Sequence, residues 1–396
     1  EQTDVIHLDF SKAFDSVSHI LLVHKLKKYG FNGSLLRWLS SYLESRTQRV
    51  VLEGSASSWL PVKSGVPQGS ILGPLLFLLF IDDIYENLSE NTKIALFADD
   101  AKIYRLIRSL RDCIALQSDL SILEGWSRVW RMNFNASKCK IMSVCRDLKY
   151  PHSYTLNGTV LERVFQFNDL GVIVTSDLSW SKHIRSKVSK ASQLLGLIKR
   201  GLGYSAPTEV KRLFYQSLVR SVLSYGSVVW HPIKDDLLKL ESIQRRATKY
   251  ILNDFVSPYT SRLHKLQLLP LSFCKDINDL WFLYKCLYNY YDYNIESIVT
   301  FYDSATSVTR RRHQGVLLQP RNLRTKRAHS FYSSRIGPIW NSLPESTRTI
   351  VCQNKFIRPF RTKLFNFYAS RTALIFDVDN SCTWVTQCRC FNCRPA

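Results

Sequence analysis

Two adjacent carboxylates, Asp99 and Asp100, follow the apolar run 94–98, and a strand-like pattern resumes at once at 101–104. This order predicts a tight hairpin of two strands that carries both carboxylates at its tip. Like charges side by side repel each other, so the pair costs stability unless a cation lies between them. Divalent cations such as Mg²⁺ prefer oxygen ligands of this kind. The pair therefore predicts a metal site.

Asp9 ends a second apolar stretch, residues 5–8, ninety residues before Asp99. A carboxylate from one strand end and a pair from a neighbouring hairpin form a ligand set for two magnesium ions. In two-metal chemistry one ion activates an attacking hydroxyl, and the other neutralises charge on a triphosphate and its leaving pyrophosphate. The alternative for Asp9 is a strand-end or capping carboxylate. Asp15, in the same segment, is expected to begin the following turn or helix.

Asp82 and Asp83 form another acidic pair, directly after the apolar run 71–81. The run has a helical character, and no strand pattern follows the pair. We therefore expect a helix that ends in solvent at these two residues, and not a metal site.

The remaining pattern before residue 145 predicts the elements that position the acidic residues. Apolar side chains recur at helical spacing over 20–29, 35–43 and 115–130. Residues 49–54 and 59–62 are typical of the two strands of a hairpin.

Residues 64–77 are Gly- and Pro-rich at first and then apolar, and they lie between the two acidic elements that we interpret as metal ligands. In order, segments 8–15, 65–77 and 97–100 resemble the reverse transcriptases of LINE-type (non-LTR) retrotransposons, whose blocks read roughly LDFxKAFD, GVPQGSxLGPxLF and FADD. One block alone would be weak, but three in the right order are specific. The resemblance implies an α+β fold: a polymerase palm, with an antiparallel sheet and helices, followed by a mainly helical basic thumb and a C-terminal helical region.

The same resemblance implies roles for the acidic residues. Asp9 and Asp99 would bridge two Mg²⁺ ions, and Asp100 would complete the site nearest the primer. Lys138 would lie near the leaving pyrophosphate, where an ammonium can stabilise developing charge or donate a proton. The alternative for Lys138 is a solvated surface lysine.

Substrate-binding roles are implied for four further residues. Phe14 would lie under the incoming sugar, where its ring would clash with a 2′-hydroxyl; the alternative is a core phenylalanine. Gln68 and Gly69 would lie against the incoming nucleotide and the template, since Gly allows close backbone approach and the Gln amide both donates and accepts. An ordinary turn is the alternative there. Phe97, at the head of the acidic hairpin, is assigned to the same group.

Five regions are expected along the chain. Residues 1–148 would form the palm, 149–178 a palm–thumb β-hairpin region, and 179–255 the helical thumb. Residues 256–375 would form a basic helical region, and 376–396 a Cys-rich tail. Within the second region, 168–173 resembles the hairpin that grips the primer in the family, although Asp169 stands where an aromatic residue is more usual.

Charge is distributed unevenly over the 396 residues, whose formal net charge is +22. Residues 1–100 hold 9 Lys and Arg against 12 Asp and Glu, and the other 296 residues hold 45 against 20. An acidic metal-binding block followed by a basic remainder fits an enzyme that grips a polyanion, namely nucleic acid. The alternative is that the positive charge only aids solubility.

No secretory leader or membrane-spanning stretch is visible, so we expect no membrane partner and a nuclear and cytoplasmic location. Four cysteines crowd the tail, and their short spacing suits zinc, although it matches no common finger. The alternative is a cysteine-rich tail that binds no metal. The four are Cys382, Cys388, Cys390 and Cys393.

The predicted function is that of an RNA-directed DNA polymerase, a nucleotidyltransferase that extends a DNA primer on an RNA template with deoxynucleoside triphosphates. The resemblance begins after the fingers and endonuclease of complete family members, so we expect a fragment with little activity of its own. A catalytically silent nucleic-acid-binding remnant is the alternative. A group II intron-type reverse transcriptase is a third hypothesis, against which the LINE-like patterns at 225–226 and 244–246 argue.

Overall fold

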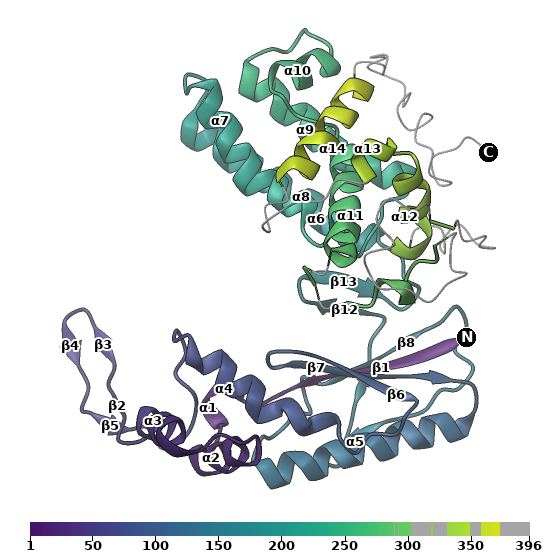
Figure 1. Cartoon of the computed structure of the whole chain (residues 1–396). Helices are drawn as coiled ribbons and strands as arrows, with labels where there is room; N and C mark the ends of the chain where they lie inside the picture. The colour runs from purple at the N-terminus through teal and green to yellow at the C-terminus, as the bar shows by residue number, and fades with distance from the viewer. Residues whose placement is uncertain (289, 292, 302–317, 320–330, 349–357, 373–396) are drawn as a thin grey trace. The chain divides into compact units, whose positions relative to one another are not determined.

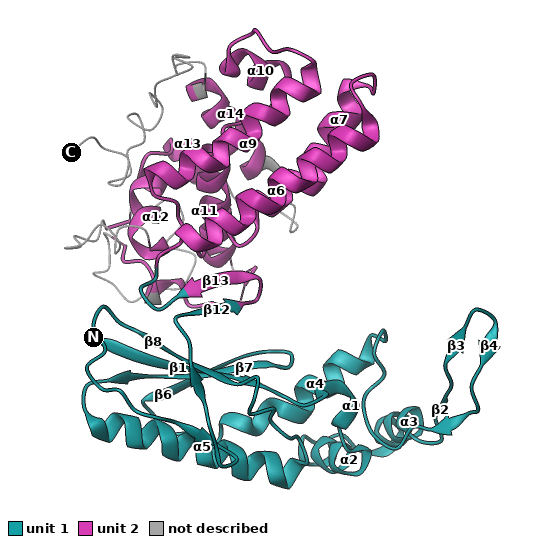
Figure 2. Cartoon of the chain, turned by 180° about the vertical axis from the view of Figure 1, so that it is seen from behind, with its two compact units in different colours: residues 1–168, 175–178 teal, residues 169–174, 179–396 magenta. Residues whose placement is uncertain are grey.

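The computed structural model describes residues 1–288, 290–291, 293–301, 318–319, 331–348 and 358–372 (Figure 1). The chain divides into two compact units (Figure 2). Unit 1 contains residues 1–168 and 175–178, and unit 2 contains residues 169–174 and those from 179 onward. Both helices and strands are present, so the predicted mixture of the two in the fold class is confirmed.

Unit 1 is built on a five-stranded sheet with the order β11-β8-β1-β7-β6. The central strand β1 runs antiparallel to both β7 and β8, and β11 is parallel to β8. Side chains alternate between the two faces of a strand, so one residue in two along β1 faces the core. The strands are β1 (Gln2–Asp9), β6 (Thr92–Phe97), β7 (Asp100–Ile107), β8 (Lys140–Val144) and β11 (Glu162–Arg163).

The longest helix of unit 1, α5, spans Leu110–Trp130 and runs along the sheet (Figure 1). It begins five residues before the predicted start because Ser109 and Asp112 form a capping box, which satisfies free N–H groups of the first turn. It ends where Arg131 adopts a left-handed conformation with φ 58°.

The predicted helices over 20–29 and 35–43 are confirmed with small shifts of their ends. A hairpin is present where one was predicted, but the strand bounds were wrong, because its turn at 53–54 lies inside the predicted first strand 49–54 and its ladders join 51–52 to 55–56 and 47–48 to 60–61. The other helices of unit 1 are α1 (Ala13–Ser16), α2 (His19–Lys28), α3 (Gly33–Leu43), α4 (Leu72–Ile81) and the 3₁₀ helix η1 (Asp82–Tyr85). The short strands are β2 (Thr47–Gln48), β3 (Val51–Leu52), β4 (Ser55–Ala56), β5 (Leu60–Pro61), β9 (Thr155–Leu156) and β10 (Thr159–Val160).

The expectation that Asp82 and Asp83 both lie in solvent is wrong for Asp83. Asp82 is exposed, but Asp83 is buried and forms an ion pair with Lys25, whose Nζ lies 2.6 Å from Asp83 Oδ1. Trp126 Nε1 donates to the same oxygen at 2.7 Å, and Lys25 Nζ lies 3.8 Å from the ring centre of Trp130. These partners come from α2 and α5, so the local pattern around residue 83 gave no sign of them.

Unit 2 is mainly helical and holds two hydrophobic clusters, one within residues 172–271 and one within 269–368. A β-hairpin of β12 (Gln166–Asp169) and β13 (Val172–Thr175) lies where the two units divide. The helices are α6 (Ser181–Leu202), α7 (Thr208–Phe214), the π-helix η2 (Tyr215–Arg220), α8 (Ser221–Ser224), α9 (Lys234–Leu252), α10 (Tyr259–Lys265), α11 (Leu271–Leu287), η3 (Ile295–Ser297), α12 (Tyr332–Asn341), α13 (Glu345–Arg348) and α14 (Arg358–Thr372).

Two predicted features lie outside the described residues. The thiol-rich tail with its four cysteines falls within 373–396, and parts of the expected basic helical region 256–375 fall within 302–317, 320–330 and 349–357. Zinc binding by the tail therefore stays a prediction. In the part of the chain that the structure describes, no helix is long and apolar enough to cross a membrane.

Candidate active site

Asp9 and Asp100 lie directly opposite each other on neighbouring strands of the unit 1 sheet. They form the last register pair of the antiparallel ladder between β1 and β7. Opposed residues of such a ladder have Cα atoms roughly 4.5–5.5 Å apart, so their side chains start from adjacent positions on one face. Asp99 is the neighbour of Asp100 in the turn that precedes β7. The fold thus brings the three predicted carboxylates to one end of the sheet.

The predicted hairpin around the acidic pair is confirmed as β6 and β7. Phe97 pairs with Asp100 at its end, so only Ala98 and Asp99 connect the two strands. Ala98 has a φ of 51°, which a side-chain-bearing residue rarely adopts. Strain of this kind concentrates at functional sites, where the surrounding ladder enforces it.

The backbone of Asp9 is held in place by two hydrogen bonds to residues within 135–139. Its backbone oxygen accepts a hydrogen bond from Asn135 N at 2.7 Å, and its own N–H donates to Cys139 Sγ at 3.3 Å. Burial raises the pKa of the Cys139 thiol, which therefore stays protonated. Asp9 Oδ2 is itself buried and accepts no hydrogen bond from any described residue.

Lys138 is brought to the acidic end of the sheet by the same loop. Its Nζ lies 3.5 Å from Asp9 Oδ2, and its side chain is 66% exposed. The ammonium is therefore held near Asp9 but not enclosed, so it has freedom to turn toward another anion. Sequence reasoning had placed this lysine near the leaving group and had not predicted its contact with Asp9.

The donor set suits a hard divalent cation, because it consists of carboxylates alone and includes Asp9 Oδ2, a buried oxygen that forms an ion pair with Lys138 but accepts no hydrogen bond from a described residue. Asp99 and Asp100 are both exposed. Within the described ranges, no three His, Cys, Asp or Glu side chains converge closely enough to hold an ion. The backbone thus brings the carboxylates together, while their side chains are spread in this conformation.

The loop that contains Gln68 is fastened to the segment after β1. Gly65 N donates to Val17 O, and Val66 N donates to Phe14 O, each at 2.8 Å. A Cβ on Gly65 would lie 2.8 Å from Asp15 Cα, so only glycine allows this approach. The loop and the Asp9 segment therefore form one packed layer.

Gln68 and Phe14 make contacts that the sequence did not predict. Gln68 Nε2 donates to Asp15 Oδ1 at 3.0 Å, which gives Asp15 a positioning role as well as its place in α1. Phe14 is half-buried and stacks on Phe77 with ring centres 4.5 Å apart. One ring face of Phe14 is thus occupied by the core, as the alternative interpretation expects.

Gly69 and Phe97 both lie at the surface. Gly69 has a φ of 82° and is exposed, and open space surrounds the position that a Cβ would take. Phe97 is 65% exposed although it belongs to strand β6. An exposed aromatic ring next to the acidic turn is available for contact with a ligand.

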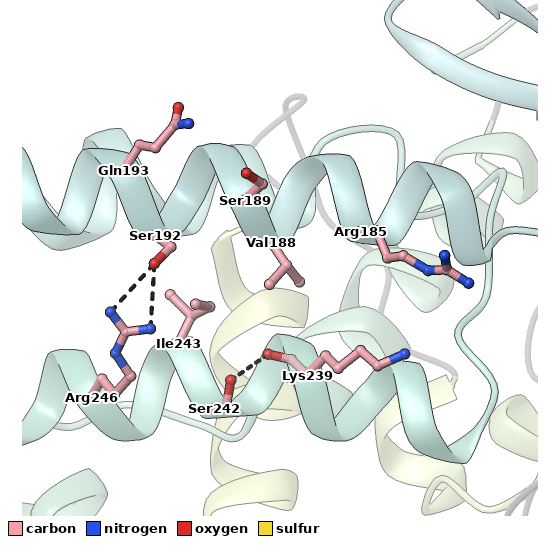
Figure 3. Close-up of a pocket in the computed structure, with 9 residues that line it drawn as sticks. All are labelled: Arg185, Val188, Ser189, Ser192, Gln193, Lys239, Ser242, Ile243 and Arg246. Atoms are coloured by element: carbon pink, nitrogen blue, oxygen red, sulfur yellow. Dashed lines mark hydrogen bonds between the residues drawn. The ribbon is translucent and has the colours of Figure 1, made fainter.

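Unit 2 presents a cationic groove between α6 and α9, with a volume of about 390 Å³ (Figure 3). Val188 and Ile243 face each other along it, while Arg185 and Lys239 lie toward one end and Arg246 toward the other. No acidic residue lines the groove. The guanidinium of Arg246 donates to Ser192 Oγ through both terminal nitrogens at 3.3 Å, and Lys239 Nζ lies 2.9 Å from Asp236 Oδ1, outside the groove lining.

The turn of the β12–β13 hairpin is fixed by α6 and by Tyr225. Leu170 and Gly171 have φ values of 48° and 78°, as a type I′ turn requires. Tyr225 Oη donates to Leu170 O at 2.8 Å, and Lys187 Nζ donates to Gly171 O at 3.0 Å. The hairpin that resembles a primer grip therefore has a rigid tip.

Comparison with known proteins adds an independent result. The family described as "Reverse transcriptase (RNA-dependent DNA polymerase)" matches residues 1–185. The RNA-directed DNA polymerase from mobile element jockey of Drosophila melanogaster is 31% identical over 260 residues, which cover 62% of this chain and 28% of the relative. The probable RNA-directed DNA polymerase from transposon X-element of the same species is 30% identical over 265 residues, which cover 63% and 28%. The chain thus spans less than a third of these relatives.

Among solved structures, apo telomerase from Candida tropicalis aligns over 67% of this chain and 46% of that chain, with 12% identity and a TM-score of 0.35. Telomerase from Candida albicans in complex with a fragment of telomeric RNA aligns over 70% and 49%, with 11% identity and a TM-score of 0.33. Scores this low carry no conclusion about this chain. The sequence comparisons show that residues 1–185 match the reverse transcriptase family, and that the chain is related to the RNA-directed DNA polymerases of non-LTR retrotransposons, as the order of its motifs predicts.

Proposed function

We propose that this chain carries the catalytic centre of an RNA-directed DNA polymerase, which adds deoxynucleotides to a primer 3′-hydroxyl on an RNA template. The observation that carries the proposal is the register pair Asp9–Asp100 beside the strained turn that holds Asp99. The relatives named above are RNA-directed DNA polymerases of mobile elements, which supports the same chemistry here.

Asp9, Asp99 and Asp100 would hold two Mg²⁺ ions, in keeping with a family that uses divalent metals. Bound there, the ions would lower the pKa of the primer hydroxyl and neutralise charge on the triphosphate. The buried oxygen of Asp9, which accepts no hydrogen bond from the described residues, is suited to ligation. Lys138, 3.5 Å from Asp9, would turn toward the phosphates when the charge of Asp9 is taken up by metal.

The substrate residues would act by position. Gln68, which Asp15 holds at 3.0 Å, would present its amide to the incoming nucleotide, and Gly69 would let the template backbone approach. Phe14 has one face on Phe77, so its edge or its other face would contact the sugar. Phe97, exposed beside the turn, would pack against the same substrate.

In this proposal unit 1 is the palm and the helices of unit 2 form the thumb. The cationic groove between α6 and α9 would contact the sugar–phosphate backbone of the template–primer duplex, because its lining residues carry cations and no acid. The turn at Leu170 and Gly171 would support the primer end. RNA template, DNA primer and deoxynucleoside triphosphates are thus the proposed partners.

The proposal is tested by primer extension on an RNA template with deoxynucleotides and Mg²⁺. Asp99→Asn keeps the size of the side chain and removes its charge, so extension should fall by about 100-fold or more. Asp82→Asn is the matched control, because Asp82 is also an exposed carboxylate of unit 1 but lies outside the site. Its extension rate should equal that of the parent.

Duplex binding measured by fluorescence anisotropy completes the experiment. Both variants should bind as the parent does, since the phosphate contacts are proposed to lie elsewhere. Full extension by Asp99→Asn would refute the catalytic assignment. Binding without any extension by the parent chain would instead favour the silent nucleic-acid-binding remnant.

A further inference from the structure

Unit 2 contains a second cavity, of about 390 Å³, that the proposed polymerase mechanism does not use. Its walls come from the π-helix η2, from α8, from α11 and from α14. No aspartate or glutamate lines it. Its polar lining consists of Gln216, Arg220, Ser221, Ser224, Asn278 and Arg361.

Arg220 forms no ion pair with an acidic side chain of the described residues, and Glu241 acts on it only as a charge beyond ion-pair distance. Its guanidinium is partly enclosed, and its Nη2 donates to Cys274 Sγ at 2.9 Å. Burial raises the pKa of Cys274 despite the nearby arginine, so the thiol stays protonated and supplies no counter-charge. A partly buried cation without an anion in direct contact is costly, which makes an anionic ligand favourable here.

Arg220 is also placed by unusual backbone. It is the last residue of the six-residue π-helix Tyr215–Arg220, which also carries Gln216. π-helical turns are rare, and they occur frequently at functional sites because they redirect side chains. Arg361, from α14, is exposed and lines the same cavity. Two guanidinium groups from elements far apart in sequence thus share one space.

We propose that this cavity binds a phosphate group, either from the backbone of a nucleic-acid strand or from a free nucleotide. Guanidinium groups match the geometry of phosphate oxygens with paired hydrogen bonds, and the nearby serine hydroxyls and asparagine amide add further donors. Ile277 and Phe365 supply an apolar wall for a sugar or base. The cavity volume lies in the range of small-ligand sites. The inference rests on the proposed function only in taking nucleic acid as the available polyanion.

The test measures binding of a fluorescent 5′-phosphorylated single-stranded oligonucleotide to the full chain in EDTA, over a series of salt concentrations. Arg361→Gln removes one cavity cation from an exposed position, so folding should not be affected. It should weaken binding several-fold and reduce the salt slope by about 0.7, the value expected for one lost phosphate contact. Arg220→Gln should act in the same direction.

Lys363→Gln is the matched control, because Lys363 lies on the same helix, is exposed and does not line the cavity. Competition by a deoxynucleoside monophosphate would identify a free nucleotide as the ligand, and its absence would identify backbone phosphate. Equal affinities and salt slopes for Arg361→Gln and Lys363→Gln would overturn the proposal. Since no metal or chemistry is involved, a failure of the polymerase assignment would leave this result unchanged.

Discussion

Three glycines near Gln68 offer a graded test of how the substrate loop is packed. In Gly69→Ala, a new Cβ would meet open space, but the residue has a φ of 82°. In Gly73→Ala, φ is not positive, but the Cβ would overlap with Pro67 O. In Gly65→Ala, φ is 92° and the Cβ would also lie 2.8 Å from Asp15 Cα. The series therefore separates backbone strain from steric overlap.

The expected magnitudes follow from these two terms. Left-handed backbone costs a residue with a Cβ about 1–2 kcal/mol, which is the full effect expected for Gly69→Ala. Overpacking typically costs about 1–3 kcal/mol. In Gly73→Ala this cost of overpacking should exceed the stabilisation of up to about 1 kcal/mol that alanine gives a helix relative to glycine, so the substitution should destabilise α4. Gly65→Ala combines both terms and should cost about 2–5 kcal/mol.

The assay is native-state hydrogen exchange of the β1 amides in the full chain, which reports on unit 1 by itself. A single unfolding curve would mix two units and is not suitable. Primer extension by Gly65→Ala should fall as well, because Gln68 is carried by the displaced loop. If Gly65→Ala proves no more destabilising than Gly69→Ala, the inferred close approach to Asp15 is wrong.

Two further predictions concern buried charge. Asp83→Asn leaves the Lys25 ammonium buried without its counter-charge, so the free energy of unfolding of unit 1 should fall by about 3–5 kcal/mol. In the same hydrogen-exchange measurement, Asp82→Asn, at an exposed position, should change it by no more than about 0.5 kcal/mol. Burial and the nearby Lys187 and Lys275 lower the pKa of His183 to about 4, so its neutral form is favoured in the folded state. The stability of unit 2 relative to His183→Gln should therefore fall by about 1.4 kcal/mol per pH unit as pH drops from 6.5 to 4. Hydrogen exchange of the α6 amides measures this stability, and a constant difference between the two proteins would contradict the prediction.

Elements with strong local patterns were predictable from the sequence. The acidic hairpin was predictable because two strand patterns flank a two-residue connection, and α5 because its apolar residues recur at helical spacing. The capping box at Ser109 and Asp112 was present in the sequence and would have corrected the start of α5. The burial of Asp83 was not predictable, because Lys25 and Trp126 reach it from distant segments.

The site could be predicted as a set of residues but not as a geometry. Motif order placed the acidic residues together, yet only the structure shows Lys138 beside Asp9 and Gln68 fastened to Asp15. Cys139 was missed, although it directly follows Lys138, because a thiol that accepts a backbone hydrogen bond has no sequence signature. Such contacts depend on how loops fold back, which periodicity does not encode.

The placement of the two opposed carboxylates is determined by the hydrophobic core. Along β1 and β7, the pairs Ile6–Ile103 and Leu8–Ala101 are buried. The pair Asp9–Asp100 comes next in the ladder, so its side chains point to the other face of the sheet. A slip of one residue would turn the side chains of one strand to the other face, which would expose residues such as Ile103. Each buried isoleucine contributes roughly 1.5–3 kcal/mol, so the slip is strongly disfavoured. Burial of Leu8 and Ile6, one and three residues before Asp9, therefore holds Asp9 opposite Asp100 against the repulsion between the two carboxylates.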